Sequence, residues 1–519
     1  MRPHLRSRAT LAALVCLPVL AGCGSAGAGG GSDDPDPAKA IPGSALVYVE
    51  GTYRPEGKQA DAVEALSKKV ANIDDPGERI VQYLESQNGK GEDVSYEQDI
   101  KPWIGRRIGF GVTGNTEESL SFVAAAGVSD ADKAKDFVAD QSKGDKKGSY
   151  EGVTYYDDQD EDTIVGVSGD YLVLADKLPN FQAAIDQIAK DDGSMADSKA
   201  FDDAVDDLPD DRLATLFVNG ERFKQLVLQD PDLRGSGGSA IVEKAFGGLR
   251  GISGALTAAE DKAVVETRVV TDGKASTLGL FGPGVAPALV REAPADSLFV
   301  YGAKDVGGTY KTAFDEFAGA LGGAALRGQL QSGLGIDLDR DVFSWIGDTV
   351  VFGRGTGLQS FDGAVMIDAK DADAAATAIP RLIGLARQQG GVAFDPLSLG
   401  GADQAYQARI PGAPEPLFVA RKGTRVVIAL GEDAARAGLQ PSSTLDANGA
   451  YDRAKQATAG LDPSLIVDVQ RVVDIAEQAA AGDEDFARAK PYLEAFTLLV
   501  AGAKRDGDTL VSRVALGVE

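Results

Sequence analysis

The sequence predicts an α+β fold of two tandem homologous halves, each a mainly antiparallel sheet packed with helices. Three observations predict this class. Short apolar runs are separated by turn residues, segments with helical periodicity lie between them, and the same pattern occurs twice in 519 residues. A chain of this length has room for two or more domains with cores of their own.

The clearest internal repeat surrounds the two tryptophans. The segment that contains Trp103 and Gly105 (Asp-Ile-Lys-Pro-Trp-Ile-Gly) matches the segment that contains Trp345 and Gly347 (Asp-Val-Phe-Ser-Trp-Ile-Gly). Other matched segments follow in the same order in both halves, so we treat these four residues as structural markers of the repeat. We predict a first repeat over residues 41–275, a linker over 276–292 with a Gly-Pro-Gly breaker, and a second repeat over 293–519.

Within the first half, alternating short elements predict strands and helices in turn. The expected strands are 46–50, 107–112, 120–128, 153–157, 163–167, 171–175, 213–219, 250–258 and 262–271. The expected helices lie near 63–70, after the capping residue Asp130, near 179–190 and near 221–246. Because adjacent strands are joined by short turns, we expect an antiparallel sheet with helices on one face.

The N-terminus predicts export. Residues 1–22 carry three arginines and then an apolar stretch of about 14 residues, which is too short for a spanning helix and fits a signal peptide. The segment Leu20-Ala21-Gly22-Cys23 resembles the lipobox of bacterial lipoproteins, which implies cleavage before Cys23 and lipid attachment to its thiol. The alternative is an ordinary signal peptide with an incidental cysteine. Residues 23–40 are rich in Gly, Ser, Asp and Pro, and we predict a flexible tether there.

Removal of residues 1–22 limits the available chemistry. The single histidine and Cys16 lie in that segment, so the mature chain has no histidine, and its one cysteine is the predicted lipidation site. This excludes His- and Cys-dependent catalysis, zinc sites of the His/Cys type, haem and iron–sulfur ligation, and disulfides. We expect no cofactor. The mature chain keeps 49 of the 52 basic residues against 79 acidic ones, a formal charge of −30, which excludes nucleic acid as a favoured partner.

Three groups of residues are candidate sites. Asp157, Asp160 and Asp162 belong to an acidic run that is a weak Ca²⁺ candidate, but the run lacks the glycine and final glutamate of an EF-hand, and a solvated hairpin loop is the favoured interpretation. Trp103 and Trp345 could stack on a ligand, but their recurrence favours a packing role. The GxGxxG run at Gly109, Gly111 and Gly114 precedes another expected strand, not a helix, which indicates a hairpin and no dinucleotide site.

The lipobox with its tether, the Trp-Ile-Gly element, and a Pro-x-[Ser/Asp]-x-Leu-[Val/Phe] segment at Pro42 and at Pro294 occur together. The chain resembles a family of secreted bacterial lipoproteins known only as a domain of unknown function, over residues 41–519. The resemblance implies the fold and implies no activity.

We therefore predict a non-enzymatic lipoprotein on the outer face of the cell membrane, bound to the membrane through its lipid and to an envelope protein or glycan. One alternative is a carrier or sensor of a small or lipidic ligand within or between the repeats. The other is a hydrolase that uses carboxylates, for which the sequence selects no catalytic residue.

Overall fold

The computed structural model describes most of the chain after residue 33. The described residues are 34–71, 95–116, 119–229, 242–243, 246–272, 284–320, 323–357, 360–390, 392–413, 415–480 and 482–519. The chain divides into two compact units, which we call unit 1 (residues 1–234 and 248–272) and unit 2 (residues 235–247 and 273–519). Each unit is described by itself below.

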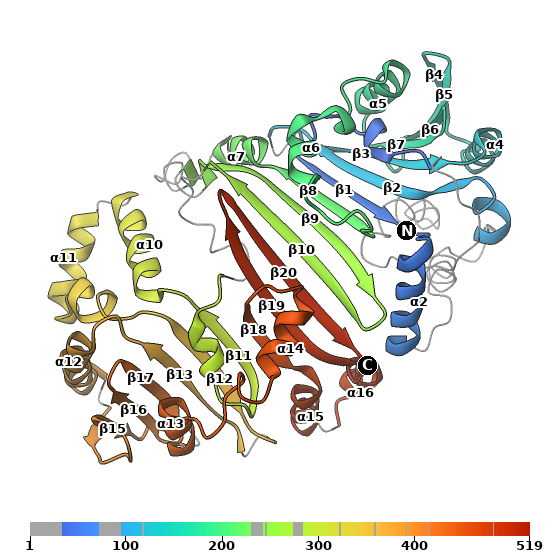
Figure 1. Cartoon of the computed structure of the whole chain (residues 1–519). Coiled ribbons are helices and arrows are strands. Elements are labelled where there is room, and N and C mark those ends of the chain that lie inside the picture. Colours follow the sequence, from blue (N-terminus) through green and yellow to red (C-terminus); the bar gives the residue numbers. More distant parts are fainter. Residues whose placement is uncertain are drawn as a thin grey trace. The chain divides into compact units, whose positions relative to one another are not determined.

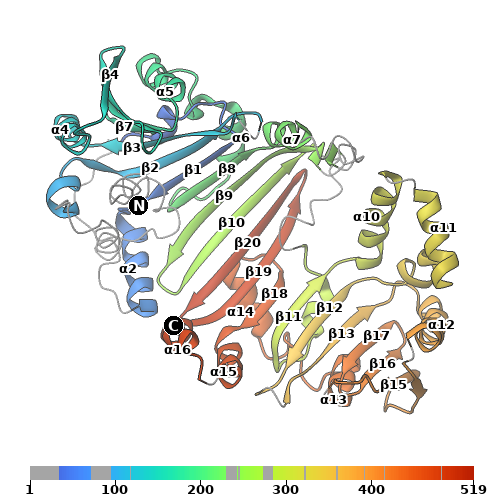
Figure 2. The ribbon, with the colours of Figure 1, turned by 180° about the vertical axis from the view of Figure 1, so that it is seen from behind.

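Unit 1 contains one antiparallel sheet (Figure 1). Its strands are β1 (Val47–Thr52), β2 (Ile104–Thr113), β3 (Ser121–Val128), β4 (Lys146–Tyr150), β5 (Val153–Asp158), β6 (Thr163–Ser168), β7 (Tyr171–Ala175), β8 (Ala214–Asn219), β9 (Leu249–Ala259) and β10 (Lys262–Thr271). They pair in the order β10–β9–β8–β1–β2–β3–β7–β6–β5–β4, and β1, β2, β8 and β9 are seen side by side from behind in Figure 2.

Unit 2 contains a second antiparallel sheet. Its strands are β11 (Ser297–Ala303), β12 (Thr349–Arg354), β13 (Asp362–Asp368), β14 (Phe394–Pro396), β15 (Gln404–Ala408), β16 (Leu417–Lys422), β17 (Arg425–Leu430), β18 (Pro463–Asp468), β19 (Phe496–Asp506) and β20 (Thr509–Val518). They pair in the order β20–β19–β18–β11–β12–β13–β17–β16–β15–β14. Strand for strand, this is the order of unit 1.

The helices connect these strands. Those of unit 1 are η3 (Pro37–Ala40), α2 (Gly57–Ala71), η4 (Tyr96–Ile100), α4 (Ala131–Gln141), α5 (Leu178–Lys190), η6 (Met195–Asp197), α6 (Lys199–Val205) and α7 (Gly220–Gln229). Those of unit 2 are η8 (Ala288–Glu292), α10 (Val306–Ala320), α11 (Gly323–Leu334), η9 (Asp339–Phe343), α12 (Ala372–Gly390), α13 (Glu432–Leu439), α14 (Ala450–Ala457), α15 (Val469–Ala479) and α16 (Glu484–Leu493). None of the helices in the described ranges combines the length and the apolar character needed to cross a bilayer.

Helices cover both faces of the unit 1 sheet, so the expectation of helices on one face is wrong. Side chains alternate between the two faces along a strand. On β3, Val123 packs in one apolar cluster with α5, and its neighbour Ala124 packs in another with Trp103 and α4. The β3 sequence SFVAAAGV is apolar at almost every position, which is the pattern of a strand that is buried on both faces.

Unit 2 repeats this layering. On β13, Met366 packs in a cluster with α13 and α14, whereas the next residue, Ile367, packs in a cluster with Trp345 and α12. At β3 and at β13, each sheet therefore lies between two helical layers.

The prediction of a flexible tether through residue 40 is wrong for residues 34–40. Asp36 caps η3 by accepting a hydrogen bond from the Ala38 N–H at 3.0 Å, with Pro37 at the start of the helix. Ala38 and Ala40 are 1% and 0% exposed. The segment folds because its small apolar residues occupy space on the sheet, which its polar composition does not reveal.

Candidate functional site

The segment Asp34–Ile41, here called the strap, lies on the unit 1 sheet. Ile41 is fully buried and belongs to the same apolar cluster as Tyr48 and Phe181. The sheet makes room for the strap with glycines. An added Cβ at Gly109 would lie 2.7 Å from Pro37 Cβ, and one at Gly111 would overlap with Ile41 Cγ2. Two glycines of the GxGxxG run thus accommodate the strap on β2.

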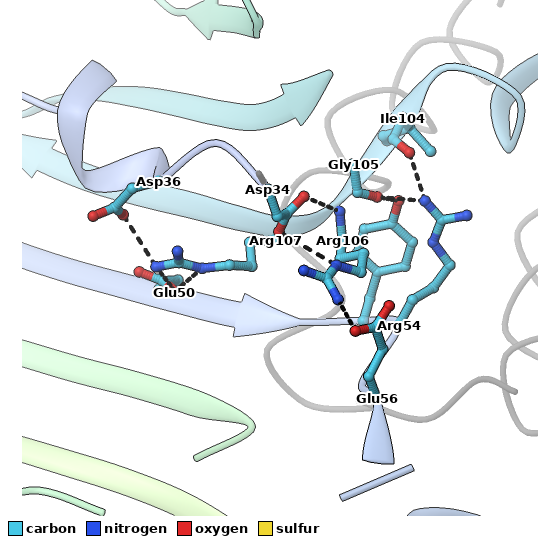
Figure 3. A network of polar contacts seen from close by, with 10 residues as sticks. Asp34, Asp36, Glu50, Arg54, Glu56, Ile104, Gly105, Arg106 and Arg107 are labelled. Atoms are coloured by element: carbon cyan, nitrogen blue, oxygen red, sulfur yellow. Dashed lines mark hydrogen bonds and ion pairs between the residues drawn. The ribbon is translucent and has the colours of Figure 1, made fainter. Parts of the chain in front are cut away.

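The first part of a polar network holds the middle of the strap (Figure 3). The Arg107 guanidinium on β2 donates to Asp36 at 3.0 Å and to Glu50 of β1 at 2.6 Å. The Tyr48 hydroxyl donates to the other Glu50 oxygen at 2.7 Å. Burial alone would lower the pKa of Arg107, but the carboxylates of Glu50 and Asp36 outweigh burial and raise it. Burial, with the Glu50 charge, raises the pKa of Tyr48 well above its usual range, so the phenol stays protonated as a donor.

The second part holds the start of the strap. The Arg106 N–H donates to Asp34 Oδ1 at 2.9 Å, and the Arg106 side chain pairs with Asp34 and Glu56. Asp34 also explains Gly105, because an added Cβ there would lie 2.7 Å from Asp34 Oδ1 and 2.8 Å from the Gly127 carbonyl.

A cationic side chain closes this end of the network. Arg54 donates to the carbonyls of Ile104 and Gly105 at 2.5 and 2.8 Å, and the Tyr53 hydroxyl also donates to the Gly105 carbonyl (Figure 3). Burial raises the pKa of Tyr53 well above its usual range. The carboxylate, guanidinium and phenol groups of this network bind to each other or to backbone carbonyls, an arrangement that positions a chain segment.

Unit 2 has a counterpart of the strap in η8. Val290 is fully buried, and an added Cβ at Gly302 of β11 would overlap with its Cγ2 atom. Arg291 pairs with Asp446 at 3.1 Å and lies 4.1 Å from the ring centre of Tyr451. In unit 1 the matching residue Lys39 pairs with Asp191 at 3.0 Å. Sequence reasoning missed both straps, although Pro35-x3-Lys39-x2-Pro42 and Pro287-x3-Arg291-x2-Pro294 carry the signal.

The tryptophans have the same structural role in both units. Trp103 and Trp345 are 2% and 3% exposed, so neither offers a platform to an external ligand. Their indole N–H groups donate to the carbonyls of Asp99 and Asp341 at 2.6 and 2.9 Å.

The aspartate of each Trp motif also caps its own turn. The Asp99 and Asp341 carboxylates accept hydrogen bonds from the backbone N–H four residues earlier, at Ser95 and Asp337. At the other end of the motif, an added Cβ at Gly347 would overlap with the Asp368 carbonyl, as one at Gly105 would crowd Gly127. The repeated motif thus encodes a capped turn, a buried indole and a close approach between strands.

The acidic run forms the turn between β5 and β6. Asp158, which is buried, accepts from the backbone N–H of Asp160 at 2.9 Å and of Glu161 at 3.3 Å, and Asp162 has a positive φ of 50°. Across the described ranges, no three His, Cys, Asp or Glu side chains form a group that could hold a metal ion, and Asp157, Asp160 and Asp162 are not brought together as one. The GxGxxG run ends β2 and turns at Gly114, which has a positive φ of 106°, and the next strand, β3, begins at Ser121.

The lipobox residues Leu20, Ala21, Gly22 and Cys23 lie outside the described residues, as do residues 276–283 of the predicted linker. The prediction of a linker is wrong for residues 288–292, which form η8 with Leu289 and Val290 buried.

Comparison with known proteins places the chain in a family and adds no activity. No curated protein matches it. Three crystal forms of TP0453, forms I, IV and III, are similar at 13% identity with TM-scores of 0.25, 0.27 and 0.26. The matches cover 45–46% of this chain and 80% of that one, and TM-scores this low do not establish a shared fold. The model of a family described as "Protein of unknown function (DUF3352)" matches residues 9–499, so the chain belongs to that family.

Proposed function

We propose that this protein is an exported lipoprotein, anchored through Cys23 to the outer face of the cell membrane, and that its two α+β units bind an envelope protein or glycan without catalysing a reaction. The observation that carries this proposal is the fastening of the strap to the sheet at a position close after Cys23 in the sequence. Asp34, the first described residue, follows Cys23 after ten residues and is bonded to the sheet through Arg106. Because the strap is bonded to the sheet, a lipid on Cys23 would be connected to unit 1 through only a short segment of chain.

The state of the carboxylates supports a non-enzymatic role. Six described carboxyl groups have a pKa clearly below its usual value: Asp130, Asp186, Asp197, Asp305, Asp341 and Asp462. In each case a hydrogen bond from a lysine, arginine or serine is the largest cause. A hydrolase of the two-carboxylate type needs one acid with a raised pKa as its proton donor.

We infer that the two units arose by duplication of one ancestral unit. The support is threefold. Their ten strands pair in the same order, each Trp indole donates to the carbonyl of the aspartate four residues earlier, and each strap lies over a glycine of the sheet. All three features occur in both units, and each involves contacts between residues that are far apart in the chain. Their joint occurrence is therefore stronger support for duplication than the similarity of separate short sequence segments.

The anchoring is tested by the mass of the N-terminal peptide of the protein isolated from host membranes. We expect Cys23 to carry a diacylglycerol thioether, and we expect Cys23→Ala to move the protein into the aqueous fraction. A wild-type protein with an unmodified Cys23 in the aqueous fraction would contradict the proposal.

The binding role is tested by native mass spectrometry and by cross-linking in the intact envelope. We expect the isolated protein to have the mass of its own polypeptide and lipid, and to be cross-linked to one envelope component reproducibly. An additional ligand of roughly lipid or metabolite size that is lost on denaturation would instead favour the carrier.

A further inference from the structure

The first residue of the strap, Asp34, lies at one end of the unit 1 sheet. Asp34 Oδ1 lies beside Gly105 at the start of β2 and beside Gly127 near the end of β3. Gly127 pairs with Tyr171, and the Val128 N–H donates to the Asp170 carbonyl at 2.8 Å. The turn between β6 and β7 is therefore at the same end as Asp34. We call this end of the sheet, marked by Asp34, Gly105 and Asp170, the strap end.

The opposite end of the same strands carries the acidic run. Strand β6 begins at Thr163, which pairs with Asp158 of β5, and it ends at Ser168, which pairs with Tyr171 of β7. The turns on the two sides of β6 are thus at opposite ends of the sheet. From the rise per residue of a strand, Asp160 and Asp170 are separated by roughly 20–25 Å along the strand direction.

We propose that the strap end is the membrane-facing surface of unit 1, and that the partner it faces is the lipid headgroup surface. The inference rests on the proposed lipidation of Cys23. Eleven peptide steps join Cys23 to Asp34, and a chain of this length spans at most about 36–40 Å even when fully extended. The strap end cannot move farther from the lipid anchor than this limit while the strap stays in place.

The strap itself does not add to the length of the connection between Cys23 and the sheet while it stays bound. Its middle is held by the two carboxylates that Arg107 bridges, and its end is held by Ile41, which is fully buried. Releasing the strap would lengthen the connection by up to seven residues but would expose Ile41 and separate Arg107 from Asp36. The docked strap therefore limits the stand-off distance of unit 1.

Charge determines how closely the strap end approaches the lipid. Asp170, Asp210 and Asp211 are exposed at this end, and the carbonyl of Leu213, which follows the last two, accepts from the Thr52 N–H at 2.8 Å. Exposed carboxylates are repelled by an anionic leaflet over a Debye length, about 30 Å at 0.01 M salt and about 3 Å at 1 M. The tether opposes this repulsion, so the strap end is held near the surface without adsorbing to it.

The test uses matched single-cysteine variants of the full lipidated protein. Asp160→Cys and Asp170→Cys lie in exposed turns on the two sides of β6 and change charge equally. Since the mature chain has no other cysteine than Cys23, each new thiol takes one donor dye. Energy transfer to an acceptor lipid is then measured in vesicles of phosphatidylcholine mixed with phosphatidylglycerol, after the mass of the N-terminal peptide has established the lipid on Cys23.

We expect transfer from the Asp170→Cys label to exceed that from the Asp160→Cys label by about twofold or more, because the strand rise places the second label roughly 20–25 Å farther along the sheet. A Gly/Ser insert between Gly29 and Gly30 that doubles the spacer should reduce this difference. Raising the salt concentration should increase transfer from the Asp170→Cys label.

Equal transfer from both labels, or a difference that survives the insert unchanged, would overturn the membrane-facing assignment. If energy transfer from the Asp170→Cys label does not change with salt concentration in anionic vesicles, the proposed repulsion between the strap end and the leaflet is wrong. An N-terminal peptide without lipid would instead overturn the proposed function, and it is detected before any transfer is measured.

Discussion

The contact between Ile41 and Gly111 makes a prediction that tests the strap directly. Gly111 lies in β2, and a Cβ added to it would overlap with Ile41 Cγ2. The same added Cβ would lie 3.7 Å from Ile41 Cβ and 3.6 Å from Ala45 Cβ, which are ordinary van der Waals contacts. Gly111→Ala should therefore clash with isoleucine at position 41 and fit beside alanine there.

The magnitudes follow from burial. Ile41 is fully buried, so Ile41→Ala should destabilise unit 1 by about 2–5 kcal/mol through lost transfer energy and a cavity. Gly111→Ala should cost about 1–3 kcal/mol through overpacking. The double variant removes the clash and fills part of the cavity, so it should cost no more than Ile41→Ala alone. The coupling energy is then about 1–3 kcal/mol.

The assay uses the distribution of tryptophan. Each unit holds one buried tryptophan, Trp103 in unit 1 and Trp345 in unit 2. In a Trp345→Phe background, urea unfolding followed by fluorescence reports on unit 1 alone. This avoids treating a chain of two units as a single two-state system.

A matched glycine provides the control. Gly251, in β9 of the same unit, has its nearest added-Cβ neighbours at 3.4 and 3.5 Å, so Gly251→Ala should be tolerated and additive with Ile41→Ala. If the Gly111→Ala and Ile41→Ala costs also add to within about 0.5 kcal/mol, the strap does not lie on β2 and the reasoning fails.

Three further predictions concern the charged groups. Arg107→Ala should lower the free energy of unfolding of unit 1 by about 2 kcal/mol in the Trp345→Phe urea assay. This is less than the roughly 3–5 kcal/mol expected when a fully buried ion pair is broken, because the Arg107 side chain is 30% exposed. Arg107→Lys should recover part of this loss. Hydrogen bonding from Arg340 lowers the pKa of Asp341, so this group stabilises unit 2 above the unfolded value near 3.8, and the contribution is lost as pH falls through the folded value. Asp341→Asn should flatten this acid limb in Trp345 fluorescence. Burial raises the pKa of Tyr451 to about 12, so its contribution is present below about pH 10 and is lost as pH rises toward 12. Tyr451→Phe should remove that alkaline component, and an unchanged alkaline limb would contradict the assignment.

Much of the strand and helix pattern could be predicted because neighbouring residues determine it. The hairpin turns and the Asp130 cap are local, and Asp130 indeed accepts from the Lys133 N–H at 3.1 Å. Strand β4 was missed because Lys146–Tyr150 has no apolar alternation and is a strand only through its pairing with β5. The order in which distant strands pair, such as β1 with β8, also depends on contacts that no local pattern specifies.

The candidate site was the least predictable part. Composition alone placed Asp34–Ala40 in a tether, since Asp, Pro, Lys and Ala are typical of linkers. What folds the segment is space on the sheet above Gly109 and Gly111, together with the Arg106 N–H and the Arg107 guanidinium of a strand about 70 residues away. The sequence pattern around Gly109 and Gly111 indicates only a hairpin. Their second role, which is to leave room for Pro37 and Ile41, depends on the position of the strap in the folded unit.

The sequence by itself determined the α+β class, the hairpins, the absence of histidine after His4 and of cysteine after Cys23, and the two tryptophan motifs, because each depends on residue identity at short range. The tertiary structure decided that both sheet faces are covered, that the strap belongs to the folded body, and which strands lie next to each other. These depend on burial and charge pairing between residues far apart in the chain, where the free energy comes from contacts that exist only after folding.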